Sequence, residues 1–163
     1  MSFLLSPRGI ISFMVGLSFI FGIVYFVALG HTLADLKTIL LGFQINPWVG
    51  WSFLSPSMSA SVTDYLIRPH TLATASPPAQ TYVPIAALAL GGFVTGLIRK
   101  HPLNSILIGF TFAIIIIIAY GISLLLNPFS IIPGILGLSL NDIVLLFIIP
   151  SATGFVGSLL TVI

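Results

Sequence analysis

Cysteine and glutamate are both missing from this chain of 163 residues, and charged side chains of either sign are scarce. Without cysteine the chain has no disulfide, no thiolate metal ligand and no cysteine nucleophile. Five Lys/Arg and three Asp residues are too few to form the hydrated surface of a soluble domain, in which about 25% of residues are normally charged. They are also too few for a nucleic-acid-binding surface, which needs clustered basic residues. We therefore expect neither a soluble domain nor a nucleic-acid partner.

Motifs of the common enzyme classes are missing as well. The sequence contains no G-x-S-x-G nucleophile elbow, no P-loop, no H-E-x-x-H pair and no G-x-G-x-x-G turn. With no glutamate and no cysteine, most acid–base and nucleophilic arrangements have too few parts. The sequence therefore predicts a protein that is not an enzyme and carries no cofactor.

Hydrophobic sequence is what the chain has in abundance, with 58% hydrophobic residues and a mean hydropathy of +1.23. Five consecutive isoleucines, Ile114 to Ile118, would favour a strand in water because isoleucine is β-branched. In lipid, however, the backbone must satisfy its own hydrogen bonds, which permits only helices or closed barrels. Barrel strands alternate apolar and polar residues, and this run does not. The pattern predicts an all-α integral membrane protein.

Uncharged stretches indicate about four transmembrane helices. The first stretch could also be a secretory signal peptide, because Arg8 precedes it. The apolar part of a signal peptide is only about 7–15 residues long, so we expect a retained span. Residues 127–142 are apolar but broken by proline and glycine, which favours an interfacial or re-entrant loop. Within a single membrane domain of residues 1–163, the expected spans are residues 9–29, 82–98, 103–126 and 143–163.

The segment 31–81, between the first two spans, has a different composition. The segment contains Trp48 and Trp51, and tryptophan is enriched at the level of the lipid headgroups. Long connections in compact proteins are usually functional or disordered, and this one has too many large apolar residues for a solvated tail. We therefore predict an ordered interfacial cap that presents the two tryptophans to headgroups or to a partner. It begins with an amphipathic helix whose apolar side chains recur at helical spacing: Leu33, Leu36, Leu40 and Phe43.

The orientation follows from the basic residues. Arg8 precedes the first span, and Arg99 and Lys100 lie in the short turn between the second and third. An even number of spans places these residues and the C-terminus on one side, which the positive-inside rule makes cytoplasmic. Residues 31–82 would then face outward. Lys37 and Arg68 oppose this assignment, but they lie in a longer segment, where the rule weakens.

Helix capping is the simplest role for the acids. Each follows a Ser or Thr by three residues, as expected for a capping box, in the pairs Thr32–Asp35, Ser61–Asp64 and Ser139–Asp142. Asp142, which lies beside a span, is also a candidate start for an ion relay, although the uncharged runs hold no second ionisable group to continue it. Asp64 and Arg68, four residues apart, are expected to form a surface ion pair.

Histidines raise the question of a metal site. His31 and Asp35 are four residues apart and would share a helix face, with Asp64 and His70 on the same predicted side. These four residues are a candidate set of nitrogen and oxygen ligands. In the alternative interpretation His31 ends a span and His70 lies in a turn after Pro69. We expect no bound metal.

Small residues four apart recur in the predicted spans and allow close approach of helix backbones in lipid. They predict helix-packing faces, either within the chain or between chains. The residues are Ser12, Gly16, Ser18, Gly22, Ala87, Gly91, Gly92, Gly96, Gly154 and Ser158.

The chain has many small residues for helix packing and few side chains that could act in catalysis. This combination favours a non-catalytic accessory or scaffolding subunit of a larger membrane protein assembly. Its expected partners are the lipid bilayer and other membrane subunits or further copies of itself. An alternative is a small oligomeric channel or transporter for a neutral or weakly polar solute. A third hypothesis is an outward-facing metal-handling membrane protein that uses the candidate ligands named above.

Overall fold

The computed structural model describes residues 6–37, 59–74, 79–126 and 135–161, and the regular structure in these ranges is entirely helical. The prediction of an all-α fold is therefore confirmed over the described chain. The elements are α1 (Pro7–Ile23), which continues as the π-helical turn η1 (Val24–Ala28), α4 (Ser59–Ile67), α5 (Pro69–Thr74), the short 3-10 helix η3 (Ala79–Tyr82), α6 (Val83–Arg99), α7 (Pro102–Leu126) and α9 (Leu140–Leu159).

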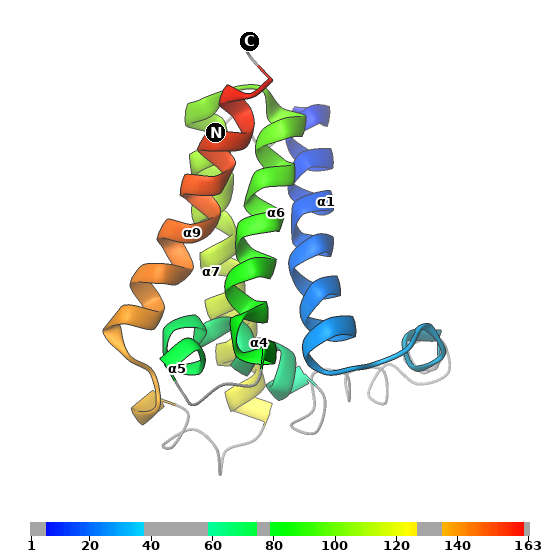
Figure 1. Ribbon diagram of the computed structural model, residues 1–163, viewed down its shortest axis with the longest axis vertical. Coiled ribbons are helices and arrows are strands. Elements are labelled where there is room, and N and C mark those ends of the chain that lie inside the picture. Colours follow the sequence, from blue (N-terminus) through cyan, green and yellow to red (C-terminus); the bar gives the residue numbers. More distant parts are fainter. Residues whose placement is uncertain (1–5, 38–58, 75–78, 127–134, 162–163) are drawn as a thin grey trace.

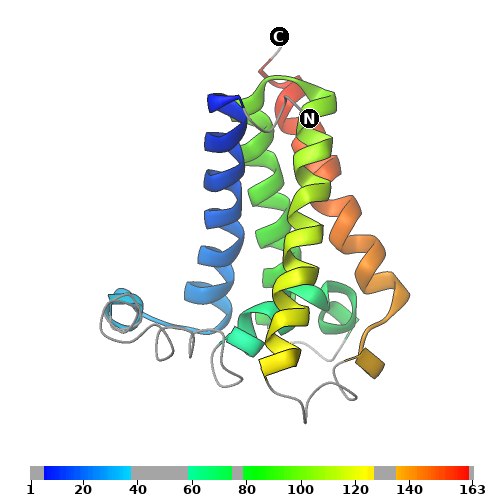
Figure 2. The ribbon, with the colours of Figure 1, turned by 180° about the vertical axis from the view of Figure 1, so that it is seen from behind.

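The long helices form a bundle with α6 at its centre (Figures 1 and 2). α6 packs against α1 on one side and α9 on the other, and α7 packs against α9. α4 and α5 lie where α1 ends and α9 begins, which we call the capped end. At the opposite end α1 begins, α9 ends and α6 turns into α7. We call this the basic end, because Arg8, Arg99 and Lys100 belong to it.

Local sequence explains where the helices start and stop. At the start of α1, the Ser6 hydroxyl accepts a hydrogen bond from the Gly9 N–H at 3.2 Å, and Pro7 occupies the first turn. α6 ends at Arg99, and the following Lys100 caps it with a left-handed backbone (φ 57°) and an N–H that donates to the Gly96 carbonyl. α7 begins at Pro102, so the predicted short turn between these two helices is confirmed.

Three helical stretches are long and apolar enough to cross a membrane: Pro7–Ala28, Pro102–Leu125 and Leu140–Leu159. The remaining predicted span, α6, has only 17 residues. At 1.5 Å per residue it is about 25 Å long, less than the roughly 30 Å of a hydrocarbon core. The last helix begins at Leu140 rather than at the predicted residue 143, because Ser139 caps it, and it continues through Pro150.

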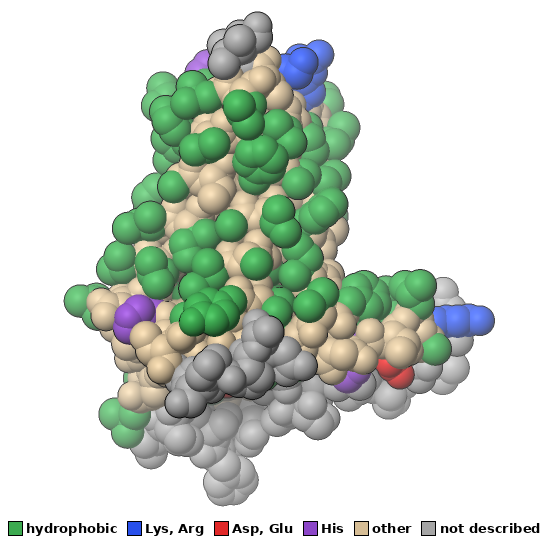
Figure 3. Space-filling view, viewed as in Figure 1, with side chains coloured by type: hydrophobic (Ala, Val, Ile, Leu, Met, Phe, Trp, Pro, Cys, Tyr) green, Lys and Arg blue, Asp and Glu red, His purple; other side chains and the backbone are tan. Residues whose placement is uncertain are grey.

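Apolar side chains cover the outside of the bundle as well as its interior (Figure 3). In the isoleucine run Ile116 is fully buried, whereas Ile114 and Ile118 are about half exposed at 49% and 55%. A soluble monomer rarely exposes contiguous apolar patches larger than a few hundred Å². Such an outer surface is consistent with an integral membrane protein.

One described part of the segment predicted to lie on the membrane face, helix α4, contributes instead to the core. Leu66 and Ile67 of α4 are buried, and α4 packs against α7 inside the bundle end. Residues 33–37 form a helical turn beside the bundle, with Leu33 exposed and Leu36 packed against the core. The predicted helical positions Leu40 and Phe43, like Trp48 and Trp51, lie outside the described residues.

Candidate functional site

The most connected polar group at the capped end is the buried carboxylate of Asp142. It forms the predicted capping box with Ser139, accepting from the Ser139 hydroxyl at 2.6 Å and from its N–H at 3.2 Å. The same carboxylate also accepts from the backbone N–H groups of His70 (2.7 Å) and Thr71 (2.8 Å) and from the Thr71 hydroxyl.

The contacts of Asp142 join two helix starts. The first N–H groups of a helix have no partner within that helix. Pro69 begins α5, so the N–H groups of His70 and Thr71 are such groups, and the Asp142 carboxylate supplies their acceptor. One carboxylate therefore satisfies the starts of both α5 and α9. These partners are backbone amides and hydroxyls, which favours a structural role; the ion relay stays a prediction.

Arg68, between α4 and α5, connects three parts of the chain. Its guanidinium lies 3.2 Å from the Asp64 carboxylate and donates to the Tyr120 hydroxyl of α7 at 3.2 Å. It also lies against Gly137, where an added Cβ would come within 2.9 Å of a guanidinium nitrogen. The predicted Asp64–Arg68 pair is present, but Arg68 reaches into the bundle and is not confined to the surface. Burial raises the pKa of Asp64, and the neighbouring Arg68 partly opposes this rise.

The capping role predicted for Asp64 is wrong. α4 begins at Ser59, two residues before Ser61, so Asp64 lies in the middle of the helix. By contrast, the Thr32–Asp35 cap is confirmed: the Asp35 carboxylate accepts from the Thr32 N–H at 2.7 Å and from its hydroxyl at 2.8 Å. These hydrogen bonds, with a smaller contribution from His31, lower the pKa of Asp35.

The candidate metal ligands are spread over the capped end. His31 lies 4.0 Å from Asp35 and stacks on Tyr25, Asp64 pairs with Arg68, and the His70 backbone contacts Asp142. Within the described ranges, no three or more His and Asp side chains lie close enough together to hold a metal ion.

The basic end has a simpler chemistry. Arg99 donates to the Ser6 hydroxyl at 2.6 Å and so ties the end of α6 to the start of α1. Lys100 and His101, in the turn before α7, are exposed. All eight charged residues of the sequence lie in described ranges, and none of the three acids is at this end.

Glycines bring the backbone of α6 against both neighbours. A Cβ at Gly96 would lie 2.1 Å from the carbonyl oxygen of Gly154, and one at Gly91 would lie 2.8 Å from that of Gly16. Cβ atoms essentially never come this close, so only glycine fits. Of the predicted packing residues, Ser18 is exposed and Gly22 has open space around its Cα. The others are buried: Ser12, Gly16, Ala87, Gly91, Gly92, Gly96, Gly154 and Ser158.

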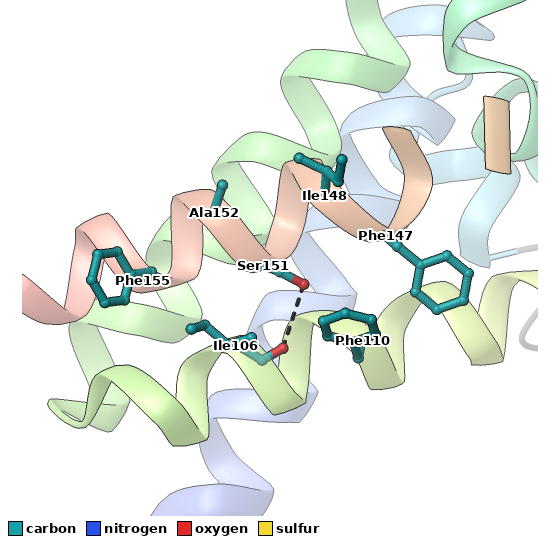
Figure 4. A pocket seen from close by; sticks show the side chains of 7 residues that line it. All are labelled: Ile106, Phe110, Phe147, Ile148, Ser151, Ala152 and Phe155. Carbon is teal, nitrogen blue, oxygen red and sulfur yellow. Dashed lines mark hydrogen bonds between the residues drawn. The ribbon is translucent and has the colours of Figure 1, made fainter. Parts of the chain in front are cut away.

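Apolar grooves open on the outside of the described part of the bundle, and the following two are lined by no charged side chain. The first, of about 270 Å³, lies beside Ser18 and Gly22 and is also lined by Phe21, Tyr25, Phe26, Leu36 and Val62. The second, of about 360 Å³, lies between α7 and α9 (Figure 4), and is lined by Ile106, Phe110, Phe147, Ile148, Ser151, Ala152 and Phe155.

Sequence reasoning did not identify Thr71 and Tyr120, which form hydrogen bonds with Asp142 and Arg68 at the capped end. Their partners Asp142 and Arg68 lie 71 and 52 residues away in the chain. No local spacing indicates such a contact. No protein-family model matches the chain, and no curated protein or solved structure is significantly similar to it.

Proposed function

We propose that this protein is a non-catalytic integral membrane protein that serves as an accessory or scaffolding subunit of a larger membrane assembly. The observation that carries the proposal is the use of the acids: Asp35, Asp64 and Asp142 are each engaged in a helix cap or an ion pair. Acids engaged in this way stabilise the fold. The two apolar grooves on the outside of the bundle contain no charged side chain that could take part in a reaction.

Membrane insertion is supported by the three long apolar helices and by the apolar outer surface. α6 is the proposed fourth span, since 17 residues is at the lower limit for crossing and its neighbours shield much of it from lipid. By the positive-inside rule, the basic end and both termini face the cytoplasm, and the capped end with residues 31–82 faces outward.

The proposed partner-binding face is the part of α1 around Ser18 and Gly22. The glycines of α6 are already packed within the chain, whereas an added Cβ at Gly22 would meet no atom within 4 Å. The apolar groove beside Gly22 offers space for a large side chain of a partner helix. Small residues four apart are the usual means by which membrane helices approach closely.

Purification in a mild detergent tests this role. We expect the full chain to resist extraction from membranes by alkaline carbonate and to co-purify with a membrane protein in fixed stoichiometry. Gly22→Leu should abolish most of the co-purification. Gly121→Leu is the matched control, because an added Cβ at Gly121 in α7 also meets no atom within 4 Å and Gly121 lines neither of the two grooves described above. Equal losses from both variants would contradict the proposed face.

The channel or transporter alternative has a different outcome in the same preparation. Large core side chains such as Phe112, Ile116 and Leu146 are completely buried in the bundle, so a solute pathway would have to run between copies. A stable homo-oligomer that conducts a neutral solute in liposomes would replace the accessory-subunit proposal.

A further inference from the structure

The groove between α7 and α9 has a definite depth relative to the basic end. It extends from Phe155 to Phe147 along α9, which is about 12 Å at 1.5 Å per residue. The edge of the groove nearest the basic end, at Ile106, lies about 6 Å along α7 from the start of that helix at Pro102. One leaflet is about 15 Å thick, half of the roughly 30 Å hydrocarbon core. The length of the groove is therefore close to the thickness of one leaflet, and the groove begins near the turn between α6 and α7.

The lining of the groove suits a hydrocarbon chain. Phe110 and Phe147 form its wall farther from the basic end, with ring centroids 5.4 Å apart (Figure 4). The only hydroxyl in its lining, that of Ser151, points to the Ile106 carbonyl at 3.4 Å (Figure 4). Ala152 is the smallest side chain in the lining. The groove thus offers an apolar path without a free polar group that would favour water.

The turn above the groove supplies the complementary charge. Lys100 and His101 are exposed and immediately precede α7, one of the two helices that form the groove. No acid lies at this end of the bundle to compete for them. We infer that this groove binds an acyl chain of an anionic phospholipid whose phosphate is held by Lys100 and His101. The inference rests on the membrane insertion proposed above.

Native mass spectrometry of the full chain in a nonionic detergent tests the site, with phosphatidylglycerol and phosphatidylcholine of identical acyl chains as probes. We expect phosphatidylglycerol to bind about fivefold more tightly, the contribution of one lysine near the net negative charge that this headgroup has and the zwitterionic phosphatidylcholine headgroup lacks. Lys100→Gln should remove most of this preference. Lys37→Gln, at the capped end, should leave it unchanged. Equal binding of the two lipids to the unmodified chain would overturn the inference.

Two alanines give a matched pair for the groove itself. Ala152→Trp fills the groove and should weaken binding of both lipids, whereas Ala86→Trp, at an exposed position of α6, should not. In an independent measurement on the unmodified chain, phosphatidylglycerol with a photoreactive acyl chain should label residues 106–110 and 147–155 in preference to α1. Uniform labelling would overturn the site even if Ala152→Trp fails to fold. A chain that purifies without detergent would instead refute the membrane insertion.

Discussion

At the basic end every charged side chain is a cation, whereas the capped end holds all three acids together with Lys37 and Arg68. The helices are also joined differently at the two ends. Near the basic end, α6 and α9 touch backbone to backbone at Gly96 and Gly154. At the capped end, an inserted pair of short helices is held by the side chains of Asp142 and Arg68.

This difference shows how a chain with eight charged residues uses them. Backbone contact through glycine needs no polar group, and at this end Arg99 binds the Ser6 hydroxyl while Lys100 is exposed. The start of α5 brings the N–H groups of His70 and Thr71 into a partly buried place, and these groups require an acceptor. Asp142 supplies it at the point where α9 also needs a cap. Asp142 therefore serves two helix starts, whereas Asp35 caps its own helical turn and Asp64 pairs with Arg68.

The largest expected effect is the loss of the capped end in Asp142→Ala. The substitution leaves the partly buried N–H groups of His70 and Thr71 without this acceptor, at up to about 1–3 kcal/mol each. We expect the free energy of unfolding to fall by on the order of 2–5 kcal/mol, measured by denaturant titration in mixed micelles. Asn141→Ala, at the exposed neighbouring position, is the control and should change it by less than about 0.5 kcal/mol.

Hydrogen exchange can show which part of the molecule Asp142→Ala destabilises. Hydrogen exchange in Asp142→Ala should accelerate in α4 and α5 while the turn at Lys100 keeps its exchange rate. Equal acceleration at both ends would show that the two ends do not behave as separate parts.

Gly96→Ala tests the glycine contact near the basic end. The added Cβ would lie 2.1 Å from the Gly154 carbonyl oxygen, a backbone atom that moves only if α6 and α9 separate. We expect a loss of about 1–3 kcal/mol in the free energy of unfolding, the usual range for overpacking. Gly121→Ala should be neutral or stabilising by up to about 1 kcal/mol, because alanine favours helix and nothing lies nearby. A loss of equal size in both variants would contradict the backbone contact.

Tyr120→Phe removes one connection of the capped end. The Tyr120 hydroxyl accepts from Arg68 at 3.2 Å, and a hydrogen bond of this kind contributes about 0.5–1.5 kcal/mol, or more to a charged group. Thermal unfolding followed by near-ultraviolet circular dichroism should show a reduced midpoint. Tyr82→Phe, whose ring is half exposed, is the control and should leave the midpoint unchanged. An unaltered midpoint in Tyr120→Phe would show that Arg68 does not fasten α4 to α7 through this bond.

The ends of helices were easier to predict from local sequence than the position of α4 in the bundle. Pro7, Lys100 and Pro102 lie within a few residues of the helix ends that they define, as do the caps at Thr32 and Ser139. The buried position of α4 was not predicted, because the Asp64–Arg68 pair is typical of a surface helix. Its position depends on partners in α7 and α9 that are more than fifty residues away. A single sequence carries no signal for such pairings.

The smallest expected effect is a pair of opposite titrations within the capped end. Hydrogen bonds from Thr32 lower the pKa of Asp35, so its ionised form is favoured in the folded chain. This contribution to stability is present above the unfolded pKa of about 3.9 and is lost as the pH falls through the lower folded value. Burial raises the pKa of Asp64, so its contribution is present below the unfolded pKa and is lost as the pH rises through the folded value.

Carboxyl carbon chemical shifts from nuclear magnetic resonance in micelles can follow the two groups separately. The Asp35 midpoint should lie below the ordinary value of about 3.9 and the Asp64 midpoint above it. Thr32→Val removes the hydroxyl donor but keeps the backbone N–H, so it should raise the Asp35 midpoint only partly and leave that of Asp64 unchanged. If Asp35 titrates at or above the ordinary value, the Thr32 cap does not hold its carboxylate in solution. If Asp64 titrates below that value, its pairing with Arg68 outweighs its burial, and the capped end is more open to water than the packing of α4 implies.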